Sequence, residues 1–231
     1  MRSQNVADKA HKKLTEADRP GRGRATQADR SARSRNALLE SAARGLSRYG
    51  YGNLVLEQVA KDAGYTRGAL YHQFKDKQEL TLAVIEWVLE TWTREVGRLV
   101  KRESDPVAAL LTMARGHAVF CRRDIARVAI ALRVEFSGQD HPVGREVEKA
   151  YEGLVEDCVR LIEAGCNAGS ISPGLPTRAL ALAFVGALEG TVIALADQAP
   201  HDELLAARAA AGVLGLDPQL TDALERTEVN P

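Results

Sequence analysis

An all-helical fold is predicted by three features of this 231-residue sequence. Apolar residues recur at spacings of three and four through most of the chain, which is the period of an amphipathic helix. Glycine and proline stand between these segments, where helices end and begin. Residues 56–74 read as two short helices joined by a glycine-containing turn, which is a helix-turn-helix. We therefore expect an N-terminal three-helix head followed by a larger helical domain.

Composition and cysteine usage are those of a soluble globular protein. Hydrophobic residues make up 45% of the chain and charged residues 27%. The three cysteines, Cys121, Cys158 and Cys166, have no paired spacing, so reduced thiols in a cytoplasm are expected. The N-terminus lacks the apolar core of a signal peptide, and no stretch approaches the roughly 18 uninterrupted apolar residues of a membrane span.

The charges are divided unequally along the chain, although the formal net charge is +0. Residues 1–77 hold 16 Lys and Arg against 8 Asp and Glu, a net charge of +8. Residues 78–231 hold 15 against 23, a net charge of −8. A one-sided positive field is typical of proteins that bind a polyanion, and a division by chance or for solubility is the alternative.

Residues 1–27 are polar and poor in large apolar residues, so we expect a disordered basic arm. Arg22 and Arg24 alternate with glycines in its flexible part. Such an arm can follow a phosphate backbone or place an arginine in a minor groove. A solvated tail is the alternative.

The first helix is predicted from Asp29 to Tyr49, and Gly50 and Gly52 end it. Its apolar residues repeat at spacings of one and three and form one stripe that can support the next two helices. The stripe consists of Leu38, Leu39, Ala42, Ala43 and Leu46.

The helix-turn-helix follows at residues 56–74. Gly64 stands where the first helix needs a left-handed residue after its end, and Thr66 stands as the N-cap of the second helix. The second helix buries Leu70 and Phe74, which lie on one face at i, i+4 spacing. This helix, Arg67 to Phe74, presents Arg67, Gly68, Ala69, Tyr71, His72 and Gln73 on or near its outer face.

The run AGYTRGALYHQF at residues 63–74, with KDK at 75–77 and EL at 79–80, resembles the TetR family of bacterial transcription regulators. The specific match covers Leu38 to Leu80. One departure lies before the helix that starts at residue 56, where the family usually has a Thr or Ser that caps the helix and touches a phosphate. Leu54 and Val55 stand there instead, and Asn53 is the only nearby side chain able to cap.

The resemblance implies a homodimer whose DNA-binding domain, residues 28–75, reads an inverted-repeat operator, in most members to repress transcription. Arg67 is the best candidate for base readout, because a guanidinium can bind guanine O6 and N7 together. Gly68 lets the helix approach the bases, and Ala69 can touch a thymine methyl. Phosphate contacts are expected from Thr66, Tyr71 and Lys77, and contacts of either kind from His72 and Gln73.

Residues 76–217 are predicted to form a helical ligand-binding and dimerisation domain. Asp76 and Glu79 give a start like a capping box, and Asp105 with Pro106 opens another helix. The expected helices are residues 76–102, 106–121, 124–136, 143–168, 177–196 and 202–214, with a loop at 137–142.

The last two helices are predicted to form a homodimer interface. The helix at 177–196 is apolar nearly all round and must be buried on all sides, which two copies achieve by packing four helices around a two-fold axis. A buried helical hairpin in a monomer is the alternative. The expected interface residues are Leu180, Ala183, Phe184, Ala187, Gly190, Leu204, Leu205 and Ala209, and residues 218–231 form a polar tail.

The resemblance further implies a pocket for a small, largely apolar effector that releases the DNA. The candidate lining residues are apolar or carry a polar group: Trp87, Trp92, Met113, His117, Phe120, Cys121, Phe136, Tyr151, Cys158 and Glu189. Ordinary core packing is the alternative for each of them. For Glu189, pairing with an arginine is favoured over a place at the dimer interface or a contact with the ligand.

Other classes of function are open. A constitutive or architectural DNA-binding protein needs no effector. An all-helical enzyme using His117 and Glu135 is conceivable, but the sequence contains no G-x-S-x-G, H-E-x-x-H, P-loop or C-x-x-C motif, and we predict neither a metal site nor a cofactor. A redox-sensing cysteine is a further alternative, with Cys121 beside Arg122 and Arg123 the nearest candidate.

Overall fold

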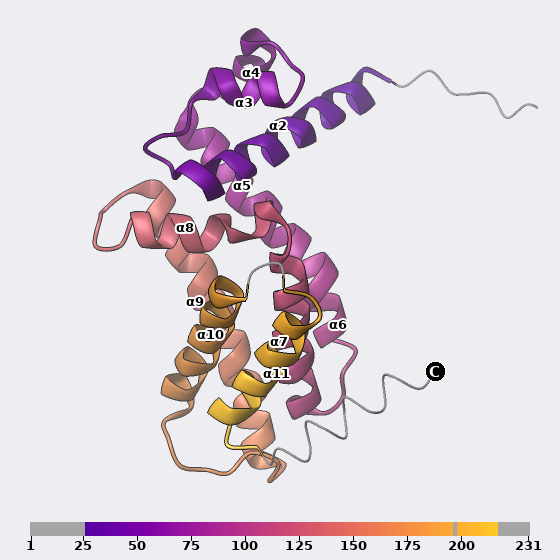
Figure 1. Cartoon of the computed structure of the whole chain (residues 1–231), viewed down its shortest axis with the longest axis vertical. Coiled ribbons are helices and arrows are strands. Elements are labelled where there is room, and N and C mark those ends of the chain that lie inside the picture. The colour runs from indigo at the N-terminus through magenta and orange to yellow at the C-terminus, as the bar shows by residue number, and fades with distance from the viewer. Residues whose placement is uncertain (1–25, 196–197, 217–231) are drawn as a thin grey trace, which may run out of the picture. The chain divides into compact units, whose positions relative to one another are not determined.

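The structure is a computed structural model that describes residues 26–195 and 198–216. The predicted arm, with Arg22 and Arg24, and the predicted tail at 218–231 lie outside the described residues. Packing divides the chain into two units, residues 1–34 and residues 35–231. Every regular element in the described ranges is a helix (Figure 1), so the prediction of an all-helical fold is confirmed.

Helix α2 spans Gln27–Tyr49 and begins in the first unit. At its start the amide of Thr26 donates to a carboxylate oxygen of Asp29 (2.9 Å), and the amide of Asp29 donates to the Thr26 hydroxyl (3.1 Å). This reciprocal pair is a capping box. In the second unit the predicted apolar stripe of α2 is buried, and Gly50 ends the helix with a φ of +74°.

Helices α3 (Leu56–Asp62) and α4 (Arg67–Gln73) form the predicted helix-turn-helix. Gly64 has a φ of +77° in the turn between them, as its position predicts. The Thr66 hydroxyl accepts a hydrogen bond from the amide of Ala69 at 3.2 Å and caps α4.

Helix α4 is anchored by one face, because Leu70 and Phe74 are completely buried. Helix α3 is tied to α2 by the Ser41 hydroxyl, which donates to the carbonyl of Val59 at 2.9 Å. The helix-turn-helix is therefore a packed unit that leaves the remaining surface of α4 free.

The start of α3 differs from the family pattern in the way the sequence suggests. Its N-cap residue, Val55, makes no side-chain capping bond. Leu54 is buried and fills the space above Gly45, where a Cβ would lie 2.6 Å from its side chain. Asn53 donates to the carbonyl of Tyr49 at 3.1 Å, so this side chain satisfies the end of α2 instead of capping α3.

Helix α5 (Lys77–Trp92) begins at its N-cap Asp76, whose carboxylate accepts from the amide of Glu79 at 2.8 Å. The helix predicted to run on to residue 102 continues as a π-helical turn, η1 (Thr93–Gly97), and a short helix, α6 (Arg98–Val100). The π turn ends at Gly97, which is a weak helix former, and π turns of this kind often occur at functional sites.

Helix α7 (Pro106–Cys121) begins as predicted, with the Asp105 carboxylate accepting from the amide of Ala108 at 2.7 Å. The predicted helix at 124–136 consists of a 3-10 turn, η2 (Asp124–Arg127), followed by α8 (Val128–Glu135). Helix α9 (Pro142–Asn167) follows the predicted loop and starts one residue early, because His141 caps it.

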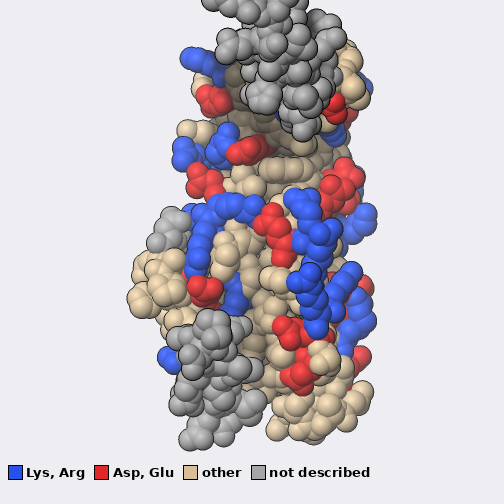
Figure 2. Space-filling view, turned by 90° about the vertical axis from the view of Figure 1, so that its right-hand side faces the viewer, with Lys and Arg blue, Asp and Glu red and all other residues tan. Residues whose placement is uncertain are grey.

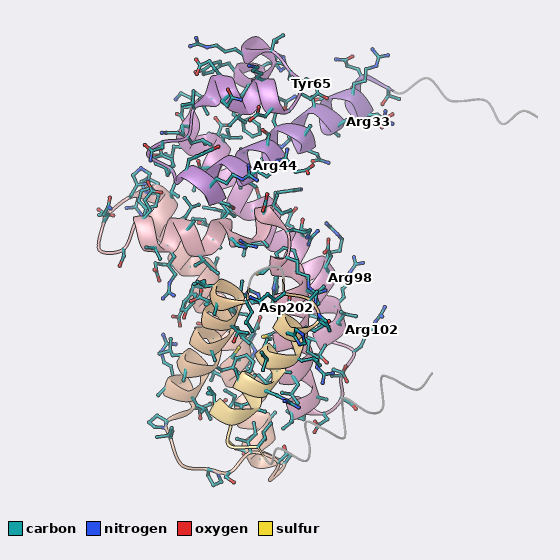
Figure 3. The ribbon with its side chains drawn as sticks, viewed as in Figure 1. Arg33, Arg44, Tyr65, Arg98, Arg102 and Asp202 are labelled. Carbon is teal, nitrogen blue, oxygen red and sulfur yellow. The ribbon has the colours of Figure 1, made fainter. Side chains whose placement is uncertain are left out.

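Helices α10 (Thr177–Ala194) and α11 (His201–Val213) pack beside each other against α7 and α9 (Figure 1). Arg122, which follows α7, donates to both carboxylate oxygens of Asp202 at 2.8 Å and to Glu203 at 3.0 Å. This cluster lies at the start of α11, where Figure 3 labels Asp202. It fixes α11 to α7.

Only one face of α10 is buried within the chain, through Leu180, Phe184, Val185 and Leu188. The prediction that Phe184 lies in an interface is wrong, because its side chain is completely buried within the chain. Leu180, a second predicted interface residue, is also buried, with 8% of its surface exposed. Among the helices in the described ranges, α10 alone is long and apolar enough to span a membrane. Its residues have a mean hydropathy of 1.4, and 33% of them are buried.

Candidate nucleic-acid interface and cavity

The outer surface of α4 is open to solvent. Thr66, Arg67, Gly68, Tyr71 and His72 are exposed, and Ala69 and Gln73 are half-buried. Apart from Lys77, which lies in α5, and the arm residues Arg22 and Arg24, the structure thus places the residues predicted to face DNA on α4 and its N-cap, whose apolar side is used for anchoring. A short exposed helix of this kind is able to enter a major groove.

The guanidinium of Arg67 has two neighbours on this surface. It pairs with Glu57 of α3 at 3.0 Å and lies 5.3 Å from the centre of the Tyr71 ring. Both members of the ion pair are more than half exposed, so the pair contributes at most about 1 kcal/mol. A guanine edge can therefore compete for Arg67, while Tyr71 limits the directions in which the side chain points.

A phosphate contact, as predicted for Lys77, requires an ammonium with a free donor. The structure shows the ammonium bound to backbone instead. The Lys77 ammonium donates to the carbonyls of Tyr51 (2.7 Å), Gly52 (3.1 Å) and Leu54 (3.5 Å), and it lies 4.7 Å from the Tyr51 ring centre. An ammonium has three N–H donors, and these carbonyls occupy all three. In this structure Lys77 holds the turn between α2 and α3.

A cavity of about 440 Å³ lies between α5, α7, α8, α9 and α10. Of the predicted lining residues, the structure brings five to this cavity: Trp92, His117, Phe120, Tyr151 and Glu189. Its other walls are mostly apolar, with contributions from Val88, Leu89, Ala129, Ile130, Val147, Ala150 and Leu154.

The other five predicted lining residues do not line the cavity. Met113 and Cys158 touch each other in the core with their sulfur atoms 3.7 Å apart. Phe136 stacks on His141 at 4.5 Å between ring centres. Trp87 and Cys121 pack within or against the core. Core packing, the alternative for each residue, is therefore correct for these five.

Several charged residues line the cavity: an arginine–glutamate pair joins α8 and α10, and Glu156, Asp157 and Arg160 contribute from α9. Arg133 of α8 donates to Glu189 of α10 at 3.4 Å, which confirms the predicted pairing of Glu189. The same guanidinium lies 3.4 Å from the centre of the Tyr151 ring and 3.3 Å from Glu148. Burial raises the pKa of the Glu189 carboxyl, and Arg133 partly offsets that rise.

His117 provides a neutral polar group in the same cavity. Its Nδ1 accepts from the indole N–H of Trp92 at 3.3 Å, and its Nε2 lies 3.6 Å from Cys121 Sγ. Burial lowers the pKa of His117 to about 4, so the imidazole is uncharged near neutral pH. Burial also raises the pKa of the Cys121 thiol to about 12 despite nearby arginines, which disfavours the thiolate that redox sensing needs.

A more open groove of about 1080 Å³ adjoins the cavity, and Leu89 and Thr93 line both. Arg94, Arg98 and Lys101 contribute cations to it from η1 and the segment that follows, and Arg35 contributes another from α2. Glutamates also line the groove: Glu79, Glu86, Glu90 and Glu146. Figure 2 shows Lys and Arg gathered with Asp and Glu on one face of the molecule, and Figure 3 shows Arg98 pointing outward.

The rest of the predicted interface lies on the far side of α10 and on α11. Ala183, Gly190 and Leu205 are exposed, and Ala187, Leu204 and Ala209 are half-buried. Apart from Arg178, which pairs with Glu152, the exposed residues of α10 are uncharged and form one stripe: Ala179, Leu182, Ala183, Gly186, Gly190, Ile193 and Ala194.

Two functional candidates were not predicted in these roles. Arg133 appears in the sequence as a charge near the end of a short helix, which is normally solvated, and nothing local indicates that it faces a cavity. The sequence suggests Glu135 only as a partner for His117, yet its carboxylate accepts hydrogen bonds from the amides of Tyr51 and Gly52, more than 80 residues earlier. Such contacts depend on packing between distant segments and leave no periodic signal.

Comparison with protein families supports the predicted resemblance. The model of the family described as bacterial regulatory proteins, tetR family, matches residues 38–84. The match covers the last part of α2, both helices of the helix-turn-helix and the first half of α5. It contains every predicted DNA-contacting residue outside the arm.

Individual relatives are distant. The regulator YfiR of Bacillus subtilis, described as an uncharacterized HTH-type transcriptional regulator, is 23% identical over 67% of this chain and 76% of its own length. AibR, solved with isovaleryl coenzyme A and operator DNA, has a TM-score of 0.65 at 19% identity, over 80% of this chain and all of its own. FadR from Bacillus subtilis, solved with stearoyl-CoA, has a TM-score of 0.65 at 17% identity, over 78% and 97%. These structural likenesses establish the fold.

Proposed function

We propose that this chain, which residues 38–84 place in the tetR family of bacterial regulatory proteins, is a ligand-responsive regulator that binds operator DNA as a homodimer. The observation that carries the proposal is the exposed outer surface of α4. This helix lies within the segment that the family model matches, is anchored by Leu70 and Phe74, and presents Arg67 and its neighbours to solvent. We assign repression to it, the mode that most of the family uses.

DNA recognition is divided between two kinds of contact in this proposal. Arg67 reads a base edge in the major groove, with Gly68 and Ala69 allowing close approach. Thr66, Tyr71 and His72 lie beside it and bind phosphates, which fix the position of α4 on the duplex. Gln73 is half-buried and contacts DNA from the end of the helix. Lys77 acts indirectly, by holding the turn before α3.

The homodimer is proposed to form through the exposed stripe of α10, together with α11. Leu182 is 41% exposed and Ile193 64% exposed, and the small residues between them allow two helices to approach closely. A second copy is the occupant that best fits, because a stripe of this length without charge is unfavourable in water. Two copies around a two-fold axis give two reading helices and require an inverted-repeat operator.

An acyl-coenzyme A is the effector class that we propose. The cavity can hold an apolar chain, and the adjoining groove offers Arg94, Arg98 and Lys101 to the phosphates of a coenzyme A. The complexes of AibR with isovaleryl coenzyme A and of FadR with stearoyl-CoA support this class. The protein is proposed to act in the cytoplasm and to carry out no catalysis.

A DNA-binding assay on the promoter nearest its own gene tests the proposal. The chain should retard this DNA, and a long-chain acyl-coenzyme A should release it, whereas free coenzyme A should not. Binding that no member of an acyl-coenzyme A series changes would favour a constitutive or architectural DNA-binding protein. No binding to any duplex would refute the regulator itself.

A further inference from the structure

The turn between α2 and α3 is held by a carboxylate from a distant helix. Glu135, the last residue of α8, accepts hydrogen bonds from the amide of Tyr51 at 2.6 Å and from the amide of Gly52 at 2.7 Å. Each of its two oxygens takes one amide. Bonds from N–H groups to a charged carboxylate are among the stronger hydrogen bonds in proteins, so this contact fixes the turn to α8.

Gly50 makes this contact possible. A Cβ at Gly50 would lie 2.6 Å from an oxygen of Glu135, so a side chain there would displace the carboxylate. The φ of +74° at Gly50 also requires the left-handed backbone that glycine adopts easily. The same turn thus needs glycine for its conformation and for the approach of Glu135.

The opposite side of the turn is held by Lys77, whose ammonium donates to the carbonyls of Tyr51 and Gly52. Glu135 therefore binds the N–H groups and Lys77 the C=O groups of the same two residues. Phe136 adds an edge contact with the Tyr51 ring at 5.2 Å between ring centres. The position of α3 follows from this turn, because α3 begins only four residues after Gly52.

The other face of α8 reaches the cavity. Ala129, Ile130 and Arg133 line it, and Arg133 is two residues before Glu135. The guanidinium of Arg133 is already engaged by Glu189 and by the Tyr151 ring. A molecule that fills the cavity contacts Arg133 and its neighbours in α8, and competes with Glu189 and Tyr151 for the guanidinium. A short helix of eight residues transmits a shift to its end because its backbone is continuous.

We propose that Glu135 is the positioning residue through which the state of the cavity controls the helix-turn-helix. Filling the cavity shifts α8, the two bonds from Tyr51 and Gly52 to Glu135 are lost, and the turn changes its position relative to α5. This inference rests on the proposed function, since it supplies the link between effector and DNA. It assigns Glu135 no contact with either ligand.

Nuclear magnetic resonance of the full chain tests this link without the natural effector. Glu135→Gln keeps the shape of the side chain, loses its charge and presents an amide NH₂ to one of the two backbone N–H groups. The cavity is filled from within by Ala150→Phe on α9 or by Gly153→Leu, where a Cβ has open space. Val134→Gln is the matched control on α8, because Val134 is 74% exposed.

The amide signals of Tyr51 and Gly52 are the readout. We expect either cavity-filling variant that folds to move both signals and to speed their hydrogen exchange on the order of tenfold or more, as loss of a strong hydrogen bond does. In the Glu135→Gln background the same filling should cause no further change, and Val134→Gln should behave like the parent chain. If Glu135 had only a structural role, cavity filling would still move the Tyr51 and Gly52 signals in the Glu135→Gln background.

Unchanged Tyr51 and Gly52 signals in a folded cavity-filling variant would overturn the inference, as would an equal response with and without Glu135. The outcome is independent of the proposed function, because the signals are recorded without DNA. A chain that fails to bind DNA but shows the coupled response would refute the regulator and leave the link in place.

Discussion

At the scale of single residues, the account depends on the division of labour on α4. Leu70 and Phe74 anchor the helix, while Arg67 stands exposed between Glu57 and Tyr71. The exposed positions could be predicted because a short motif fixes which side of the helix faces inward. The pairing of Arg67 with Glu57 and the contacts of Lys77 could not, because these partners come from another helix and from a turn.

Replacing Arg67 tests base readout. Arg67→Ala should reduce the preference for operator over random DNA by about 1–3 kcal/mol, because it removes a bidentate contact to a base. Lys75→Ala serves as the matched control, since this exposed lysine directly follows the helix-turn-helix and should affect all sequences alike. Titrations of operator and random duplexes at fixed salt measure both effects. Equal losses on the two duplexes for Arg67→Ala would contradict its role.

His117 gives the protein a predicted dependence of stability on pH. Burial lowers its pKa in the folded state from 6.5 to about 4, so between these values the unfolded chain binds a proton that the folded chain does not. Stability is therefore complete above pH 6.5 and falls as the pH drops towards 4, by about 3 kcal/mol in total. Denaturant unfolding of the parent chain and of His117→Asn across this range measures the difference. A parallel pH dependence in the two proteins would exclude the effect.

At the scale of elements, most helix boundaries followed from capping residues and from glycine or proline. Asp76, Asp105 and Thr66 cap the helices that they were predicted to cap. The π turn η1 and the 3-10 turn η2 were not predicted, because a local change in hydrogen bonding hardly alters the apolar period. Asn53 shows a further limit, since the structure uses it to satisfy the end of α2.

The attachment of α11 to α7 should depend on one ion pair. Asp202 is 5% exposed and binds Arg122 through both carboxylate oxygens, and this hydrogen bonding lowers the pKa of the carboxyl. Asp202→Asn removes the buried negative charge that pairs with Arg122 and should destabilise the fold by about 3 kcal/mol. The parent chain should lose this contribution only as the pH falls below about 4, through the lowered pKa of Asp202. Denaturant unfolding of the variant at pH 7 measures the loss, and Asp157→Asn, at an exposed site on α9, is the control. A loss of similar size in both variants would contradict the assignment.

At the scale of the whole molecule, the last helices illustrate what a sequence can and cannot indicate. The apolar character of α10 correctly predicted a buried helix, yet not which of its residues the chain itself covers. Phe184 packs inward, whereas Gly186 and Gly190 lie on the exposed stripe. A stripe of small residues and a stripe of large ones have the same period, so only packing could separate them.

The exposed stripe predicts how the proposed homodimer can be broken without damage to the fold. A Cβ at Gly186 meets nothing within 4 Å, so Gly186→Leu should leave the folded chain intact. Between two closely packed helices the same side chain would be an obstacle, and the dimer should dissociate. Gly174→Ala, also with open space and outside any helix, is the control. Sedimentation equilibrium measures the mass, and an unchanged dimer in Gly186→Leu would place the interface elsewhere.

The central claim, that two copies of α4 read one duplex together, is tested most directly by selection of bound duplexes from a random pool, followed by sequencing. The full chain should enrich an inverted repeat whose half-sites lie about one helical turn, or a multiple of it, apart. The Arg67→Ala variant should lose the same base preference in both halves. Enrichment of a single asymmetric site, or of no sequence at all, would contradict the claim.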